Sequence, residues 1–171
     1  MNLTGLSRYV LSAGAALFVA GALAAGFVNG PRAKADEGER FPPVRDEVVL
    51  KECSACHMTF APGMLPARSW HKLMAGLSDH FGENASLDPA TTQHITDLLV
   101  ANAADAGGRE SRVLRGLGQA DTPLRISETP WWIRAHQGEV HPGAFQDPRV
   151  GSKANCIACH RGASKGYYGD D

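Results

Sequence analysis

The sequence predicts an all-α fold with two small sub-domains, long loops and little or no sheet. Apolar residues recur at helical spacing between residues that commonly begin and end helices, and no segment shows the alternation of a strand. One five-residue motif also occurs twice, 103 residues apart, with dissimilar flanks, so it is not a tandem repeat. We therefore expect one sub-domain over residues 36–108, a linker over 109–123 and a second sub-domain over 124–171.

Residues 1–35 have the pattern of a secretory signal peptide. Arg8 precedes an apolar stretch over residues 9–28, and Ala33-Lys34-Ala35 forms a small-x-small cleavage site. The alternative is an uncleaved anchor, because the stretch over 9–28 is nearly long enough to span a membrane. Its richness in Ala and Gly makes it weakly hydrophobic, which favours cleavage. We expect export to the periplasm by a Sec-type signal peptide.

The charge balance excludes a broad surface for nucleic acid. The chain of 171 residues is 43% hydrophobic and 20% charged, with a net charge of −1. Removal of residues 1–35 takes away Arg8, Arg32 and Lys34, which leaves 14 basic and 18 acidic side chains and a net charge of −4. An acidic mature protein suits a partner with a basic patch.

Local signals predict five helices. The first, over residues 44–57, carries the first motif, and the second runs from Ser69 as N-cap to about Phe81, before Gly82. A third opens at Asp88-Pro89 and ends at Gly107-Gly108, with Ile95, Leu98, Leu99 and Ala103 on one face. Thr129-Pro130 begins a fourth, which runs to about Gln137 before Gly138. A final short helix carries the second motif.

The two motifs are Cys53-Ser54-Ala55-Cys56-His57 and Cys156-Ile157-Ala158-Cys159-His160. Cys-x-x-Cys-His is the attachment site of c-type haem, because two thiols one turn apart reach the two vinyl groups of one porphyrin. The histidine that follows is then placed as the proximal iron ligand. We predict two haem c groups, bound covalently by Cys53, Cys56, Cys156 and Cys159, with His57 and His160 as proximal ligands.

Three other uses of these cysteines fit the sequence less well. A four-cysteine zinc site normally has its pairs closer together and has no histidine after both. A thioredoxin-like redox pair needs a βαβ context that the sequence lacks. Disulfides within each Cys-x-x-Cys would be strained and would leave the histidines unexplained.

The remaining histidines supply candidates for the distal iron position. On a helix over 69–81, His80 shares the face of Leu73 and Leu77, whereas His71 lies on the opposite side. His136 shares the apolar side of the helix after Pro130 with Ile133 and Trp132. We expect His80 and His136 as distal ligands, whereas His71 and His94 are expected at the surface and His141 in a loop. Met64 is the alternative to His80.

The distal candidates also suggest how the ligands pair. His80 lies 23 residues after His57, and His136 lies 24 residues before His160. Pairing within each half is therefore natural, and crossed pairing between the halves stays open. We also expect Trp70, Leu73, Ile95 and Leu98 to pack around the first haem.

Besides the two haem motifs, the sequence contains several distinctive short segments. They are Leu65-Pro66-x-Arg68-Ser69-Trp70, His80-Phe81-Gly82, Asn84-Ala85, Asn102-Ala103-Ala104, Arg125-Ile126-x-Glu128-Thr129-Pro130-Trp131, His136 and Asn155. In these segments the chain resembles the dihaem cytochrome c (DHC) family of proteobacterial periplasmic electron carriers, over about residues 45–168. The resemblance implies bis-histidine ligation of both irons, with His80 and His136 as the distal ligands. It further implies a membrane-bound b-type cytochrome as donor and a small oxygen-binding monohaem cytochrome c as acceptor.

These patterns predict a periplasmic electron-transfer protein and not an enzyme. An iron with two imidazole ligands has no open position, so it passes electrons and binds no small-molecule substrate. If one distal ligand were absent, that iron would be open, and a haem enzyme or gas-binding protein would be the alternative. The sequence shows no distal acid–base group that such an enzyme would need.

Overall fold

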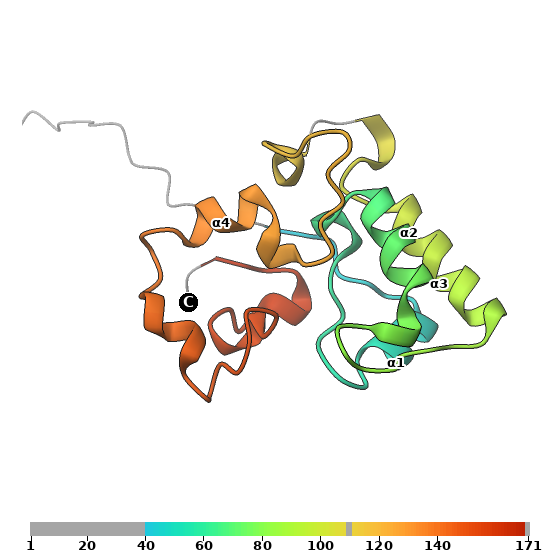
Figure 1. Ribbon diagram of the computed structural model, residues 1–171, viewed down its shortest axis with the longest axis horizontal. Coiled ribbons are helices and arrows are strands. Elements are labelled where there is room, and N and C mark those ends of the chain that lie inside the picture. Colours follow the sequence, from blue (N-terminus) through green and yellow to red (C-terminus); the bar gives the residue numbers. More distant parts are fainter. Residues whose placement is uncertain (1–39, 109–110, 170–171) are drawn as a thin grey trace, which may run out of the picture. The chain divides into compact units, whose positions relative to one another are not determined.

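The computed structural model describes residues 40–108 and 111–169, and these residues form an all-α fold (Figure 1), as predicted. Four α-helices, joined by loops and short 3-10 turns, are α1 (Glu47–Cys53), α2 (Ala67–Ala75), α3 (Pro89–Ala101) and α4 (Pro130–His136). Within these ranges the extended pairing is limited to two isolated bridges, Arg40 with Tyr167 and His80 with Glu83. The predicted signal peptide lies outside the described residues.

Helix α1 is shorter than the predicted helix over residues 44–57. It begins after Asp46, whose side chain accepts the N–H of Val49 at 3.0 Å. It ends at Cys53, and Ser54 follows as the C-cap: its backbone N–H makes the last helical hydrogen bond to the Leu50 carbonyl, and its hydroxyl donates to the same oxygen. Only the first cysteine of the first motif therefore lies on a helix.

The predicted helix from Ser69 to Phe81 is wrong at both ends. Helix α2 begins at Ala67, whose N–H donates to the Asp105 side chain at 2.7 Å, and Ser69 is buried inside it. It ends before Gly76, and a 3-10 turn over Leu77–Asp79 follows. His80 then lies in a tight turn and not on a helix.

Helix α3 begins at the predicted place and ends earlier than predicted. The Asp88 side chain accepts the N–H groups of Ala90 and Thr91, and Pro89 takes the first helical position. The helix ends at Ala101, before the predicted stop at Gly107-Gly108. Asn102 is its C-cap, and the Asn102 side-chain amide donates to the Leu98 carbonyl beside the last helical N–H.

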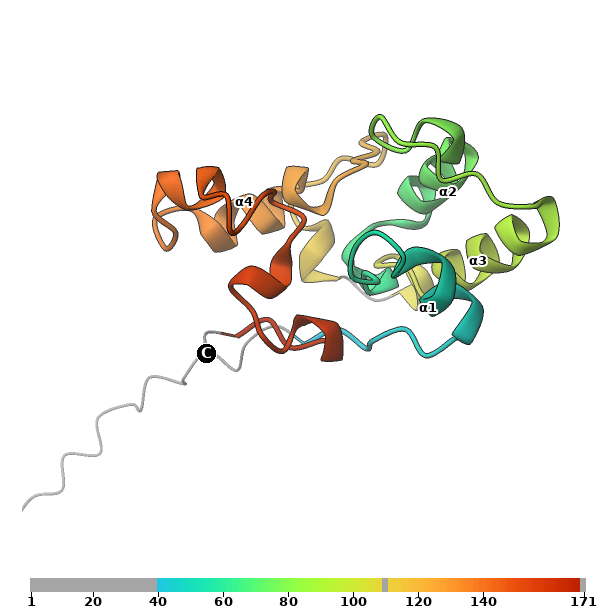
Figure 2. The ribbon, with the colours of Figure 1, turned by 90° about the horizontal axis from the view of Figure 1, so that it is seen from below.

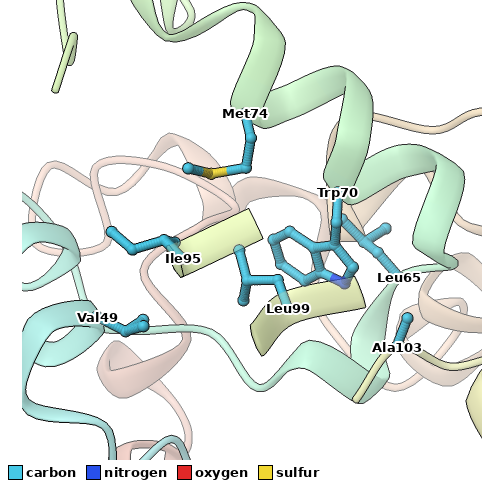
Figure 3. Packing of buried hydrophobic residues seen from close by; sticks show 7 residues of the cluster. All are labelled: Val49, Leu65, Trp70, Met74, Ile95, Leu99 and Ala103. Carbon is cyan, nitrogen blue, oxygen red and sulfur yellow. The ribbon is translucent and has the colours of Figure 1, made fainter. Parts of the chain in front are cut away.

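Helices α2 and α3 pack side by side and enclose the main apolar core. Figure 3 shows the Trp70 ring from α2 lying over Leu99, with Met74 directed toward Ile95. The Trp70 indole N–H donates to the Pro62 carbonyl at 2.8 Å, so its polar atom is satisfied within the core. The buried residues of this cluster, hereafter the α2/α3 core, are Val49, Leu65, Trp70, Met74, Ile95, Leu99 and Ala103.

The C-terminal half contains one α-helix and several 3-10 turns. Helix α4 is the predicted one: Thr129 caps it by accepting the Trp132 N–H, and it ends at His136, shortly before Gly138 in the left-handed region. The first three residues of the second motif form a 3-10 turn, Cys156–Ala158, where the sequence predicts a short helix.

The first described residues run beside the last ones (Figure 2). The Phe41 N–H donates to the Gly166 carbonyl at 2.9 Å, and the Phe41 ring makes edge contacts with Trp131 and Tyr168. Gly166 has a φ of +84°, and a Cβ there would lie 1.9 Å from the Phe41 carbonyl oxygen, so this approach requires glycine. The predicted division of the chain into two sub-domains, joined by a linker over residues 109–123, stays a prediction. Among the described helices, none is long and apolar enough to cross a membrane.

Candidate functional site

The structure brings the two histidines of the N-terminal half together. The ring centroids of His57 and His80 are 6.2 Å apart, and the ring planes differ by 27°. His57 follows α1 and is exposed, with its Nδ1 2.7 Å from the Met58 carbonyl oxygen and its ring beside Phe60 at 4.9 Å. His80 comes from the opposite side, at the end of the segment that follows α2. We call His57 and His80 the N-terminal pair.

The tight turn around His80 determines where its ring lies. The His80 N–H donates to the Glu83 carbonyl at 2.7 Å, which closes the turn. Phe81 has a φ of 57°, in the left-handed region that a bulky residue rarely adopts, and Gly82 follows at 99°. The Phe81 ring contacts the His80 ring edge-on at 4.8 Å, and the Arg125 guanidinium lies 3.8 Å from the Phe81 centroid.

His136 and His160 form the corresponding C-terminal pair. Their ring centroids are 6.1 Å apart and their planes differ by 88°. His136 lies on the last turn of α4, where its Nδ1 is 2.8 Å from the Trp132 carbonyl oxygen and its ring stacks on the Trp132 ring at 3.9 Å. His160 is the last residue of the second motif, with its Nδ1 3.4 Å from the Gly169 carbonyl oxygen and its ring 5.8 Å from that of Tyr168.

Both spacings match two imidazoles that share one metal ion. With metal–nitrogen bonds of about 2 Å on opposite sides of the metal, the ring centroids lie about 6 Å apart. Each histidine of a Cys-x-x-Cys-His motif faces the distal candidate of its own half, which is the arrangement of local pairing. The structure thus places the four predicted ligands in two pairs.

The four cysteines fit covalent attachment better than the other uses considered. All four lie in the described part of the chain and none is in a disulfide. The described residues contain no group of three or more His, Cys, Asp or Glu that could hold a bare metal ion. Cys53 and Cys156 are half-buried, and this burial raises the pKa of each thiol, whereas Cys56 and Cys159 are exposed.

The electrostatics of the distal histidines favour the form that binds iron. Burial lowers the pKa of His80, and the nearby charges of His57 and Arg125 lower it further. Burial also lowers the pKa of His136. The hydrogen bond to the Trp132 carbonyl raises this pKa, whereas the charge of His160 lowers it further. Since an imidazole must be neutral at the coordinating nitrogen, both shifts favour ligation.

Two buried hydroxyls also fit bound haem groups. The Thr59 hydroxyl, two residues after His57, and the Tyr168 hydroxyl, beside His160, have no hydrogen-bond partner within the described residues. Burial raises the pKa of Tyr168, so its hydroxyl stays protonated and can donate. A buried unpaired hydroxyl is costly unless a partner is supplied, and the acceptor groups of a bound haem would supply one.

The other predicted candidates lie elsewhere. Met64, the alternative to His80, is 2% exposed and packs in a second cluster with Phe41, Ala61, Ala104 and Val113. His71 is exposed, as predicted. His94 is also exposed, but its Nε2 lies 2.9 Å from the Asp46 carboxylate. His141 accepts the N–H of Gly143 in the loop.

The residues expected around the first haem belong to the α2/α3 core. Trp70 and Ile95 are buried there, and Leu73 and Leu98 pack against it from the side. Each also contacts other core residues, so the structure assigns them a packing role whatever else they touch.

Sequence reasoning missed several aromatic and cationic neighbours of the pairs. Phe60 lies beside His57, Phe145 lies 6.3 Å from His136, and Arg125 lies over Phe81. Lys153 lies 5.6 Å from the rings of both Trp132 and Phe145. Only the proximity of Phe60 to the first motif was a usable signal, since the others meet through tertiary structure.

Comparisons with known proteins agree with the geometry. The profile of the dihaem cytochrome c family matches residues 49–168. The diheme cytochrome c from Rhodobacter sphaeroides is 53% identical with a TM-score of 0.70, and covers 74% of this chain and 98% of its own. A second structure from that organism is 48% identical with a TM-score of 0.63, covering 73% and 98%.

A diheme cytochrome type c from Shewanella baltica OS155 is 36% identical, with a TM-score of 0.57, and covers 70% of this chain and 84% of its own. A comparison with curated proteins found no match. The family match spans most of the chain and includes both haem motifs, so the chain binds two haem c groups. The chain belongs to the dihaem cytochrome c family of electron-transfer haem proteins.

Proposed function

We propose that this protein is a periplasmic relay that passes electrons between redox partners through two covalently bound, bis-histidine-ligated low-spin haems. The observation that carries the proposal is the pair of centroid spacings, 6.2 Å for His57 and His80 and 6.1 Å for His136 and His160. Each spacing leaves room for one six-coordinate iron and for no additional ligand.

The bound haems supply one-electron redox chemistry, and the residues of the chain determine where it occurs. The cysteine pairs fix each macrocycle covalently. Carbonyl oxygens of Met58, Trp132 and Gly169 orient the rings of His57, His136 and His160. Because a carbonyl partner raises the basicity of its imidazole and stabilises the oxidised iron, both haems have low potentials.

The electron donor and acceptor are proposed from the family resemblance and the charge. A mature net charge of −4 suits acceptors and donors with basic contact surfaces. We propose a membrane-bound b-type cytochrome as donor and a small oxygen-binding monohaem cytochrome c as acceptor, with the protein exported by its signal peptide. With both irons coordinatively saturated, the protein is a carrier and not an enzyme.

The test is haem content and an absorption spectrum of the exported holoprotein, combined with a reductive titration. We expect two haems per chain, low-spin spectra in both oxidation states, no methionine–iron charge-transfer band and uptake of two electrons. A methionine–iron band, or a high-spin component in the oxidised protein, would overturn bis-histidine ligation. Retention of the protein in the membrane after removal of the cytoplasm would overturn the soluble relay in favour of an anchored subunit.

A further inference from the structure

The four paired histidines differ in how their second ring nitrogen is held. The Nδ1 atoms of His57, His136 and His160 lie 2.7, 2.8 and 3.4 Å from backbone carbonyl oxygens. The His80 ring makes no hydrogen bond to any residue in the described ranges; only its backbone is held, since its N–H donates to the Glu83 carbonyl and its carbonyl accepts the Glu83 N–H. Metal-bound histidines almost always have such a partner, which fixes the ring and strengthens the bond to the metal.

The turn that carries His80 is also strained. Phe81 follows it with a φ of 57°, a conformation that is unfavourable for an aromatic residue. His136, by contrast, lies on helix α4 and stacks on Trp132 at 3.9 Å. The distal ligand of the N-terminal half is thus the less firmly held of the two.

A cavity next to His80 provides space into which its ring can move. It has a volume of about 370 Å³ and is lined by His80 itself together with Lys72, Leu73, Gly76, Asp79, Phe81, Gly82 and Leu124. None of the residues from Cys53 to His57 lines it, so it lies on the His80 side of the pair. None of the seven buried residues of the α2/α3 core lines the cavity either, so movement of the imidazole into it would not displace them.

From these three observations we propose that His80 is an exchangeable ligand and that the N-terminal haem site of the reduced protein binds a small neutral diatomic ligand, such as carbon monoxide or nitric oxide. The proposal rests on the proposed bis-histidine ligation. The His80 Nε2–iron bond breaks, the ligand donates its electron pair to form the new bond, and the His80 ring moves into the cavity. The exchange transfers no electron. The C-terminal site does not bind the ligand, because both the backbone carbonyl and the stacked ring of Trp132 hold His136 in place.

The test is carbon monoxide mixing with the dithionite-reduced holoprotein, followed by rapid absorption spectroscopy. We expect one carbon monoxide per chain to bind slowly, at a rate that becomes independent of carbon monoxide concentration once loss of His80 is limiting. His80→Gly should replace this slow phase with a fast one of equal amplitude. His136→Gly should add a fast phase and keep the slow one. Absence of binding in the unsubstituted protein, or a slow phase that persists in His80→Gly, would overturn the proposal.

Two substitutions of one cavity residue provide a test that leaves all four histidines in place. Leu124→Phe fills space that the displaced ring needs, so the slow phase should become at least threefold slower, whereas Leu124→Ala should make it faster. Equal rates in both variants would contradict the role of the cavity. Failure of bis-histidine ligation has a separate signature: a high-spin oxidised spectrum, or a fast carbon monoxide phase in the unsubstituted protein.

Discussion

The N-terminal and C-terminal halves achieve the same ligand spacing with different amounts of apolar core. Residues 40–108 contain the α2/α3 core, which has seven buried residues including Trp70. Among the described residues after 123, the buried hydrophobic side chains are Trp132 and Ala163. Since so little apolar surface is enclosed there, we expect the cofactor to provide much of the core of the C-terminal half.

The two histidine pairs also differ in the angle between their ring planes. The N-terminal rings are close to parallel, at 27°, and the C-terminal rings close to perpendicular, at 88°. In the C-terminal pair the Trp132 stack sets the angle of the His136 ring, and in the N-terminal pair the tight turn at Phe81 sets that of His80. A similar spacing therefore arises from a helix in one half and from a turn in the other.

Loss of haem attachment should produce the largest difference between the two halves. Cys156→Ala with Cys159→Ala should reduce the haem content from two to one and unfold residues 124–168, which have little other core. Cys53→Ala with Cys56→Ala should also leave one haem, but α2 and α3 should stay protected by their own core. Intact mass and amide hydrogen exchange measure both effects. Equal protection of α4 in the two variants would contradict the proposed dependence on the cofactor.

Substitution of Trp132 should weaken only the C-terminal pair. Trp132→Leu removes the ring that stacks on His136 and most of the buried apolar surface of α4, so we expect a loss of about 2 kcal/mol in the free energy of unfolding. Denaturant unfolding of the holoprotein measures it. The N-terminal haem should keep its spectrum, and a change there instead would contradict the separate support of the two pairs.

The corresponding tryptophan substitution in the N-terminal half should lower the free energy of unfolding by a smaller amount. Trp70→Phe keeps an aromatic ring in the α2/α3 core but removes the N–H that donates to the Pro62 carbonyl at 2.8 Å. Leaving that buried oxygen unpaired should cost about 1–2 kcal/mol in the free energy of unfolding. If thermal unfolding showed no change in this variant, the hydrogen bond would not contribute to the stability of the core.

The smallest effect on stability should come from substitution of Asp46, the residue that caps the start of α1. The Asp46 carboxylate accepts the Val49 N–H and lies 2.9 Å from His94, and these contacts hold its pKa below the usual value. A lowered folded-state pKa means that the stabilisation is present above the unfolded pKa of about 4 and is lost as pH falls through the folded value.

Asp46→Asn keeps a helix cap but removes the charge. The variant should be slightly less stable than the unsubstituted protein at pH 6, and the difference should disappear as the pH is lowered below the Asp46 pKa. Thermal unfolding at several pH values measures it. A difference that does not depend on pH would mean that the carboxylate charge contributes nothing.

Local chemistry explains why some elements could be predicted from the sequence. Asp88-Pro89 and Thr129-Pro130 start helices α3 and α4 because a side-chain cap and a proline act within one turn. The motif histidines could be predicted for a similar reason, since haem attachment requires a fixed spacing along the chain.

The surroundings of His80 show what the sequence could not reveal. His80 was predicted from its place on a continuous helix, but the helix ends before Gly76 and a left-handed Phe81 positions the ring. The sequence indicates positive φ only at glycines, such as Gly82. Arg125 reaches Phe81 from 44 residues away, and such contacts depend on tertiary packing that local patterns do not encode.

Electron paramagnetic resonance of the fully oxidised holoprotein is the most direct test of two bis-histidine sites with different ring angles. Near-parallel imidazole planes separate the energies of the iron d orbitals, whereas perpendicular planes leave two of them almost equal. We therefore predict two low-spin signals of equal amount, a rhombic one from His57 and His80 and a strongly anisotropic one from His136 and His160, with no high-spin signal. A high-spin signal, or one type of low-spin signal for both irons, would contradict the account.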